Sequence, residues 1–407
     1  MYTRKTAIIC FGFVFILSGD VFLWSQDREE PEPTEYVQDL ERRIQILEQT
    51  VKLLQEQLQT NTSGREDASG SEPSQAAGAP VQLLAQDSSA DPPVDISGYA
   101  FGDYYWMAAN HDSDLEDRNG FRFRRIYLTF DKSLSDAFDA RLRLEMRSPG
   151  DFTSTTRLDP FVKNAYLRWK LSNRHQAHLG LSPTPTLNVV DEFWGYRWVE
   201  KSLLDLQKMA TSADMGLALR GSLDSGEQLR YHFMVSNGSG TRGESDQGKK
   251  VLLSLGLYPS DSVILELYSD YESRPLNTNR RTFQSFLAYQ AQWGRLGFQY
   301  VHQTRSGTPD LQLDALSLFG VAKLSPATSL FWRYDRMFDP NPDGAGISYI
   351  PFHPGAKSNF FLTGVDLKVH ERFSLLPNVE VVRYDKLQDG TRPKSDLIPR
   401  VTFFYRF

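Results

Sequence analysis

Apolar and polar side chains alternate over most of residues 94–407, a pattern typical of β-strands with two unlike faces. In residues 138–147, five apolar side chains occupy every second position, and charged side chains from Asp139 to Arg147 occupy the positions between them. Successive side chains of a strand point to opposite faces. One such strand suits a soluble sandwich, with its charged face in bulk water, or a membrane barrel, with its charged face lining a lumen.

The lengths of the connections separate these two folds. Tight turns, such as 133–135, alternate with longer polar segments, such as 183–212, along the whole region. Outer-membrane barrels have an even number of strands, short periplasmic turns and longer extracellular loops, whereas a sandwich has no reason to alternate in this way. We therefore predict an all-β fold, a closed antiparallel transmembrane β-barrel of about 16 strands, which a short α-helical coiled coil precedes. The expected strands lie near 94–108, 121–132, 136–147, 161–171, 174–182, 213–223, 227–237, 248–259, 261–271, 281–293, 294–305, 311–324, 327–338, 357–370, 372–385 and 397–407.

The last strand carries a second barrel signal. Phe403, Tyr405 and Phe407 alternate with other residues, and the given chain ends on Phe407. A terminal Phe with apolar residues at every second position before it is the pattern that the barrel-insertion machinery of the outer membrane reads. The last strand must also pair with the first, because an open strand edge is not tolerated in lipid. We assign these three residues to barrel assembly, with that machinery as a partner.

Residues 35–60 predict a coiled coil in the periplasm. The apolar residues are spaced alternately by three and four, which keeps one narrow stripe on a helix of 3.5 residues per turn. The alternative is a single amphipathic helix that lies on the barrel or the membrane. β-branched residues at one seam position and Leu at the other favour two strands in isolation. The seam comprises Val37, Leu40, Ile44, Leu47, Val51, Leu54 and Leu58.

Export and spacer segments flank the coiled coil. Residues 1–25 are interpreted as a signal peptide, with Arg4 and Lys5 before the apolar run 7–17. An uncleaved anchor is the alternative, but this run is too short to cross about 30 Å of hydrocarbon. Residues 61–93 are rich in small and polar residues without periodicity, and they are interpreted as a flexible linker before the barrel domain, 94–407. Cys10, the single cysteine, lies in the signal, so neither a disulfide nor a thiolate site is expected.

Composition limits the class of protein further. Hydrophobic residues make up 40% of the chain and the mean hydropathy is -0.44, which excludes a polytopic helical membrane protein. Aromatic residues nevertheless reach 13%, as expected of a barrel with aromatic girdles. The net charge is -6, and residues 1–93 hold 15 of the 51 acidic but only 7 of the 45 basic residues. There is no concentrated basic segment, so no nucleic-acid partner is expected. We also expect no cofactor, no metal and no catalytic site, and therefore no enzyme.

Strict alternation assigns the lumen-facing residues. These residues could select anions; the alternative is that they are ordinary lumen residues that pair with Asp139 and Glu145. Arg122 and Arg124 fall on the opposite face, where they could meet lipopolysaccharide phosphates. The expected pore-lining residues are Arg125, Tyr127, Arg141, Arg143, Arg147, Tyr166, Arg168, Lys170, Arg220 and Arg230. Because guanidinium groups stay charged and offer several fixed donors, this wall suits a passing phosphate or carboxylate.

The connection 183–212 is a candidate constriction. It carries four large aromatic residues between 193 and 198, which a fully exposed loop would not retain. We expect it to fold into the barrel and to place acidic groups opposite the basic wall, which would create a transverse field. Packing on the barrel rim, at a subunit contact, is the alternative. The constriction residues are Asp191, Glu192, Arg197, Glu200 and Lys201.

The chain resembles the phosphate-selective porin O/P family of Gram-negative outer membranes. The resemblance rests on Gly-Phe-Arg-Phe-Arg-Arg-Ile-Tyr-Leu at 120–128, Val-Lys-Asn-Ala-Tyr-Leu-Arg-Trp at 162–169, His-Leu-Gly-Leu-Ser-Pro-Thr-Pro at 178–185 and Glu-Lys-Ser-Leu at 200–203. It implies a barrel that assembles in threes, a short preceding coiled coil and phosphate among the solutes. The family usually has a basic, glycine-containing stretch where this chain has residues 182–188, so the resemblance bears on the fold more than on the solute.

These features predict an outer-membrane porin of a diderm bacterium. It would form a water-filled, homotrimeric channel for passive diffusion of small solutes, with a mild preference for anions such as phosphate. Its partners would be outer-membrane lipid and lipopolysaccharide, its own copies and the passing solutes. The alternative is a structural barrel that its coiled coil tethers to the cell wall.

Overall fold

The computed structural model describes residues 93–155 and 157–407. The predicted signal peptide, the coiled-coil seam Val37–Leu58 and the linker lie outside these residues, so those three predictions stay predictions. Within the described ranges, no helix is long and apolar enough to cross a membrane.

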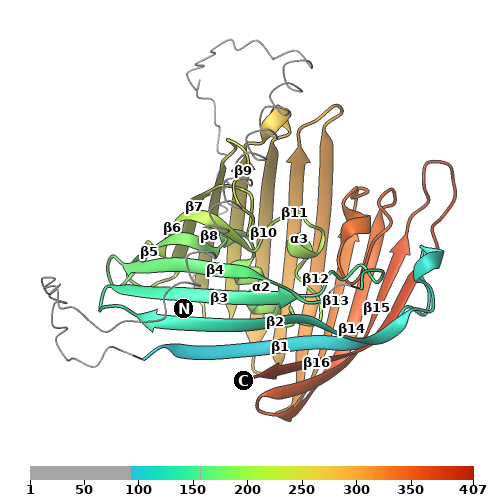
Figure 1. Cartoon of the computed structure of the whole chain (residues 1–407), viewed down its shortest axis with the longest axis horizontal. Helices are drawn as coiled ribbons and strands as arrows, with labels where there is room; N and C mark the ends of the chain where they lie inside the picture. The colour runs from blue at the N-terminus through green and yellow to red at the C-terminus, as the bar shows by residue number, and fades with distance from the viewer. Residues whose placement is uncertain (1–92, 156) are drawn as a thin grey trace, which may run out of the picture. The chain divides into compact units, whose positions relative to one another are not determined.

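The described residues form one closed antiparallel barrel of sixteen strands, in which each strand pairs with its sequence neighbours and β1 pairs with β16 (Figure 1). The strands are β1 (Asp95–Trp106), β2 (Asn119–Ser133), β3 (Phe138–Arg147), β4 (Asp159–Lys170), β5 (His175–Pro183), β6 (Ala213–Ser222), β7 (Leu229–Ser236), β8 (Lys250–Ser260), β9 (Val263–Glu272), β10 (Arg280–Ala291), β11 (Gly294–Arg305), β12 (Leu311–Ser325), β13 (Thr328–Met337), β14 (Ser358–His370), β15 (Phe373–Tyr384) and β16 (Asp396–Arg406). The predicted fold is thus confirmed, and every expected strand overlaps an observed one with ends within two residues.

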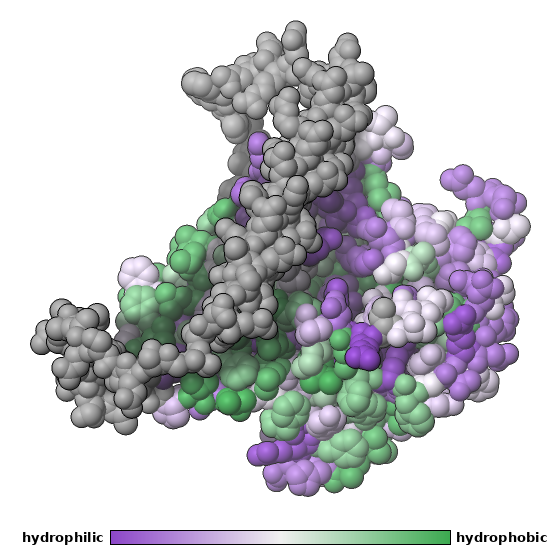
Figure 2. All heavy atoms as spheres, in the orientation of Figure 1, coloured by the Kyte–Doolittle hydropathy of each residue, from purple (hydrophilic) through white to green (hydrophobic). Residues whose placement is uncertain are grey.

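The outward-facing side chains form an apolar surface, as the alternation requires. On β8, Leu253, Leu255 and Leu257 point outward and are exposed, whereas Leu252 and Ser254 point inward and are buried. Figure 2 shows hydrophobic side chains gathered at the left and lower part of the visible surface, and polar ones gathered toward the right. An exposed apolar band around a closed barrel is the surface that lipid covers in membrane barrels.

The seam between the first and last strands closes the barrel. The backbone groups of Gly98 and Phe407 exchange two hydrogen bonds, of 3.0 and 2.9 Å. Gly98 leaves no room for a side chain, because a Cβ there would lie 2.3 Å from the Phe407 ring and 2.9 Å from the Tyr127 carbonyl oxygen. Phe407 therefore occupies the space that the missing side chain leaves.

A β-bulge corrects the prediction that Arg122 and Arg124 face outward. The β1–β2 register shifts between Phe101 and Gly102, so Arg124 has no partner in the ladder. Such an extra residue changes which face the following side chains occupy. Arg122 and Arg124 therefore face the lumen on one side of the bulge, and Arg125 faces it on the other. Outward-facing arginines for lipopolysaccharide are not found at these two positions.

Short helices occur only in the connections of the described chain. The α-helices are α2 (Pro185–Trp194) and α3 (Leu203–Leu206), and the 3-10 helices are η1 (Ser113–Leu115), η2 (Pro275–Asn277) and η3 (Gly344–Gly346). Both α-helices belong to the connection between β5 and β6, residues 184–212, which we call the inner loop. It lies inside the barrel against β7, β8, β9 and β12 (Figure 1).

Candidate functional site

The inner loop is built around helix α2, which alternation alone did not predict. Pro185 stands at its start, where a missing backbone N–H costs nothing, and Gly195 ends it in the left-handed conformation with φ 69°. Leu187, Val190 and Trp194 make one face of this helix apolar and buried. A proline before these helically spaced apolar residues and a glycine after them are the sequence signals that could have predicted helix α2.

Both ends of the inner loop are tied together where it leaves the barrel wall. The hydroxyl of Thr184 donates a 2.6 Å hydrogen bond to the carbonyl of Thr211, and the Thr184 N–H donates to the Ser212 carbonyl. The inner loop therefore leaves and rejoins the barrel wall at one place and folds into the barrel, and it does not extend from the rim.

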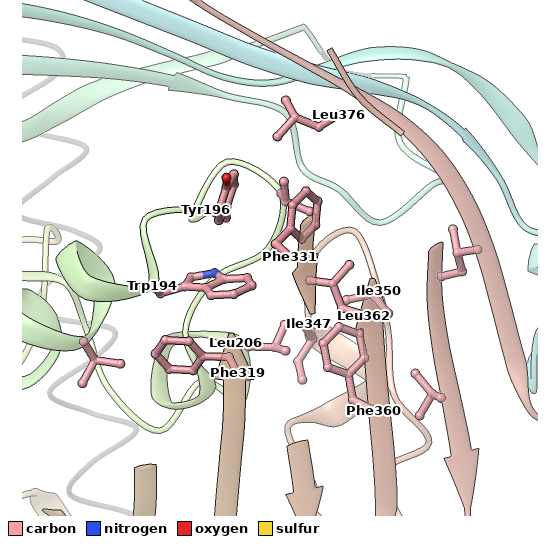
Figure 3. Packing of buried hydrophobic residues seen from close by; sticks show 14 of the residues in the cluster. Trp194, Tyr196, Leu206, Phe319, Phe331, Ile347, Ile350, Phe360, Leu362 and Leu376 are labelled. Carbon is pink, nitrogen blue, oxygen red and sulfur yellow. The ribbon is translucent and has the colours of Figure 1, made fainter. Parts of the chain in front are cut away.

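The aromatic side chains of the inner loop fill one side of the lumen. Figure 3 shows Trp194 and Tyr196 against Phe319 and Phe331 of the wall. Tyr196 stacks on Phe331 at 4.6 Å, and Trp198 stacks on Phe404 of β16 at 4.3 Å. We call this buried assembly the lumen cluster; its further members include Val190, Phe193, Val199, Leu206, Phe286, Phe360, Leu362, Leu376 and Ile398.

A second loop completes the lumen cluster. Residues 338–357, between β13 and β14, bring Ile347 and Ile350 into it (Figure 3), and Phe352 belongs to it as well. The Tyr349 hydroxyl donates to the carbonyls of Arg124 and Ser148, at 2.8 and 3.1 Å. The large apolar residues between 347 and 352 are the sequence signal that could have indicated that this loop is not fully exposed.

Buried charges lie beside the lumen cluster. Arg400 donates to Asp103 at 2.9 Å, to Glu380 at 2.8 Å and to the Tyr349 carbonyl at 2.5 Å. Asp103 also pairs with Arg122 at 3.1 Å and with Arg124 at 3.0 Å. Neither Arg400 nor Asp103 has an exposed side chain, so this network belongs to the filled side of the lumen and not to an open path.

The two largest of the cavities found lie on the other side, along β2 to β10, and a smaller one of about 300 Å³ lies between the inner loop and the tight-turn ends of β11 to β16. At the end with the long loops is a cavity of about 500 Å³, which we call the long-loop vestibule. Of its described lining residues, the basic ones outnumber the acidic ones by ten to three. The basic residues are Arg125, Arg147, Lys163, Arg197, Lys201, Lys208, Arg242, Lys250, Arg274 and Arg280, and the acidic ones are Glu145, Asp205 and Glu272.

Half of these cations have no carboxylate partner in the described chain. Arg125 and Lys163 share Glu145, at 3.3 and 3.6 Å, and Lys250 contacts Asp270 and Glu272, at 3.1 and 3.3 Å. Arg147, Lys201, Lys208, Arg242 and Arg280 form no ion pair with described residues. The sequence predicted Arg147 and Lys201 at lumen positions, whereas Lys208 and Arg242 lie in connections and Arg280 is the first residue of β10, where alternation assigns no face.

A second cavity, of about 730 Å³, lies at the end with the tight turns, and we call it the short-turn vestibule. Its described charged residues are Arg168, Lys170, Arg174, Arg220, Arg230, Asp136, Glu192 and Glu227. Residues of α2 line this vestibule, whereas Arg197, Lys201 and Asp205 line the other. The inner loop therefore stands between the two spaces.

The ten residues predicted to line a pore all lie on lumen-facing positions, but in different surroundings. Arg125 and Arg147 line the long-loop vestibule, and Arg168, Lys170, Arg220 and Arg230 line the short-turn one. Arg141 and Tyr166 border a smaller cavity, where Arg141 pairs with Asp131 at 2.7 Å. Arg143 donates to Thr129 at 2.8 Å. Tyr127 is only 2% exposed and belongs to the lumen cluster.

The predicted acidic face of the inner loop is not what the structure shows. Arg197 bridges Asp191 and Asp205, and Glu200 is buried against Arg124 at 3.4 Å on the filled side. Only Glu192 among the expected acids is exposed. Burial disfavours the Arg197 cation, but Asp205 and Asp191 outweigh this and hold the pKa of Arg197 well above its ordinary value. The loop thus has Asp191, Glu200 and Asp205 already paired, and only Glu192 stands opposite basic residues, those of the short-turn vestibule.

Comparison with known proteins supports the fold. No family model matches the chain, and no curated protein matches it either. Among solved structures, the barrel resembles an anion-selective porin from Comamonas acidovorans, with 13% identity and a TM-score of 0.58 over 77% of this chain and 99% of that one. It also resembles OmpF of Salmonella typhi, with 13% identity and a TM-score of 0.55 over 77% and 97%. A trimer form of OmpT from Vibrio cholerae matches with 12% identity and a TM-score of 0.51 over 77% and 99%. At these identities the likeness establishes the sixteen-stranded porin-type barrel.

Proposed function

We propose that this protein is an outer-membrane porin through which small solutes diffuse passively, with a preference for anions. The apolar outward surface would face lipid, the tight turns the periplasm and the long loops the exterior. The path would run along β2 to β10, past the inner loop, because the opposite side of the lumen is filled. A homotrimer is part of the proposal, supported by the family resemblance and by the trimeric form of one similar structure.

The observation that carries the anion preference is the charge of the long-loop vestibule. Ten cations against three acids leave a surplus of seven positive charges around a space of about 500 Å³. A narrow mouth lined by one sign of charge raises the local concentration of counter-ions. Arginine adds fixed donors that fit phosphate and carboxylate oxygens, so inorganic phosphate is one solute to test.

Reversal potentials across a KCl gradient in planar bilayers test this proposal. We expect anions to carry more current than cations, most clearly at low salt, because the Debye length shortens to about 10 Å at 0.1 M. The double variant Arg242→Gln/Arg280→Gln removes two surplus charges without breaking an ion pair in the described chain. It should lower the anion preference by about a quarter to a third if each charge contributes equally.

The matched control is Arg281→Gln/Arg383→Gln. Both arginines are exposed and alternate with buried lumen-facing residues such as Thr282 and Val382, so they lie on the outward face. This variant removes the same charge and should leave the reversal potential unchanged. A cation-preferring unaltered pore, or equal effects of the two double variants, would refute the proposal.

A further inference from the structure

Three successive backbone carbonyl groups of the inner loop, those of residues 199–201, accept hydrogen bonds from buried side chains. Arg124 donates to the Val199 carbonyl, and Arg333 donates to the Lys201 carbonyl. Between them, the Trp194 indole N–H donates to the Glu200 carbonyl at 2.9 Å. These donors come from β2, β13 and α2, so the short segment 199–201 is held from three separate elements.

The donors themselves cannot easily move. Arg124 is held by Asp103 at 3.0 Å, and Arg333 donates from its Nε to Asp335 at 2.8 Å and makes a second contact with the same carboxylate. Arg333 and Trp194 are 2% and 1% exposed. Each arginine therefore contacts a carboxylate besides the loop carbonyl, which restricts the direction in which it meets that carbonyl.

The captured backbone decides where the side chains point. Val199 and Glu200 are turned into the buried side, with exposures of 0% and 1%. Lys201 follows them and lines the long-loop vestibule beside Arg197 and Asp205. Its ammonium group forms no ion pair with a described carboxylate, and Asp205, the acid that acts on it most strongly, already pairs with Arg197.

We propose that Arg124, Trp194 and Arg333 are positioning residues that direct the Lys201 side chain into the long-loop vestibule. We also propose that Lys201 is a determinant of the anion preference. The second half of this inference rests on the proposed function, since it assumes that solutes pass through the long-loop vestibule. The first half concerns the direction of one side chain and can be tested separately.

Thiol labelling in single channels tests whether the side chain at position 201 points into the long-loop vestibule. In a Cys10→Ser background, Lys201→Cys should react with an anionic methanethiosulfonate reagent and lower the current. The matched control, Val199→Cys, lies two residues earlier on the same segment and should not react. Adding Arg333→Gln to Lys201→Cys should slow labelling of the introduced thiol, because the released backbone no longer holds residue 201 toward the vestibule.

Selectivity provides the second readout. Arg333→Gln, with Lys201 intact, should shift the reversal potential toward that of Lys201→Met, and Arg333→Lys should give an intermediate value because ammonium cannot hold both partners in fork geometry. Arg333→Lys also answers the question if Arg333→Gln yields no folded barrel. Equal labelling at positions 199 and 201, or no effect of either Arg333 variant, would overturn the inference. A pore without anion preference would instead reject the proposed function and leave the labelling result standing.

Discussion

At the residue scale, single backbone irregularities decide which charges reach the lumen. Strict alternation places Arg122 and Arg124 outward, but the bulge at Arg124 turns both inward. A second bulge, between β3 and β4, places Lys163 and Asn164 on the lumen side, since Asn164 pairs with Arg143 while Val162 pairs with Leu144. Burial then separates the charges into structural and exposed ones: Arg400 and Asp103 have no exposed side chain, whereas Arg147 and Lys201 line a vestibule.

Replacing Arg400 should destabilise the barrel strongly. Arg400→Gln leaves the buried Glu380 carboxylate without its cation, and breaking a buried pair costs about 3–5 kcal/mol. Urea unfolding in lipid vesicles measures the free energy of unfolding. Arg141→Gln is the control, since its pair with Asp131 is about one third exposed and solvent screening reduces its contribution to about 0–1 kcal/mol. Similar losses for both variants would contradict the structural role of the buried network.

The charge of Lys201 should make the anion preference depend on pH. Burial lowers the pKa of Lys201 to about 8, Asp205 opposes this shift and Arg125 reinforces it; Glu200 and Arg197 also lie close. Because a lysine loses its charge as pH rises through its pKa, the anion preference should fall between about pH 7 and 9. Reversal potentials over this range measure it. Lys201→Met should lack this component, and a pH profile identical to that of the unaltered pore would count against the assignment.

At the element scale, the fold depends on how its ends and its inner loop are held. The seam of β1 and β16 closes only because Gly98 makes room for the Phe407 ring. The inner loop stays inside because its two ends are tied at Thr184 and Thr211, and because its aromatic face packs on the lumen cluster. Both features are contacts between residues far apart in sequence.

A side chain at position 98 should impair barrel closure. Gly98→Val would place atoms within 2.3 Å of Phe407 and 2.9 Å of the Tyr127 carbonyl, so the terminal ring must leave its place. The yield of heat-modifiable barrel on unheated gels measures closure, and we expect it to fall. Deleting Phe407 should lower it as well, since the last strand then loses its terminal apolar residue. Gly243→Val is the control, because a Cβ there has no neighbour within 4 Å, and an equal yield from all three would refute the seam argument.

At the scale of the whole molecule, the barrel interior is divided lengthwise. Except for the smaller cavity at its tight-turn end, one side is filled by the inner loop, the loop 338–357 and the buried charges around Asp103. The other side contains two charged spaces, and both have more basic than acidic described residues. The proposed channel is thus eccentric, and its selectivity would depend on residues of β2 to β10 more than on the opposite wall.

The role of residues 35–60 in oligomer formation is a prediction at the scale of the whole molecule that rests on the sequence alone. Residues 35–60 carry the coiled-coil seam, and we expect them to join copies of the chain in the periplasm. We expect three copies, because the family resemblance implies barrels that assemble in threes. Deletion of 35–60 should weaken or abolish trimers of the detergent-solubilised protein, as measured by size-exclusion chromatography with light scattering. A monomer before and after the deletion would refute this expectation.

The sequence by itself determined the number, order and approximate ends of the strands, because alternation and loop length are local properties that a closed barrel imposes on every strand. It also determined most lumen-facing positions, since the side-chain period of a strand is two. Only the tertiary structure decided where that period breaks, as at Arg124, because a bulge depends on the register with the neighbouring strand. It alone showed that Glu200 is buried against Arg124 while Lys201 meets the vestibule, since those directions depend on donors from β2 and β13 that lie far away in sequence.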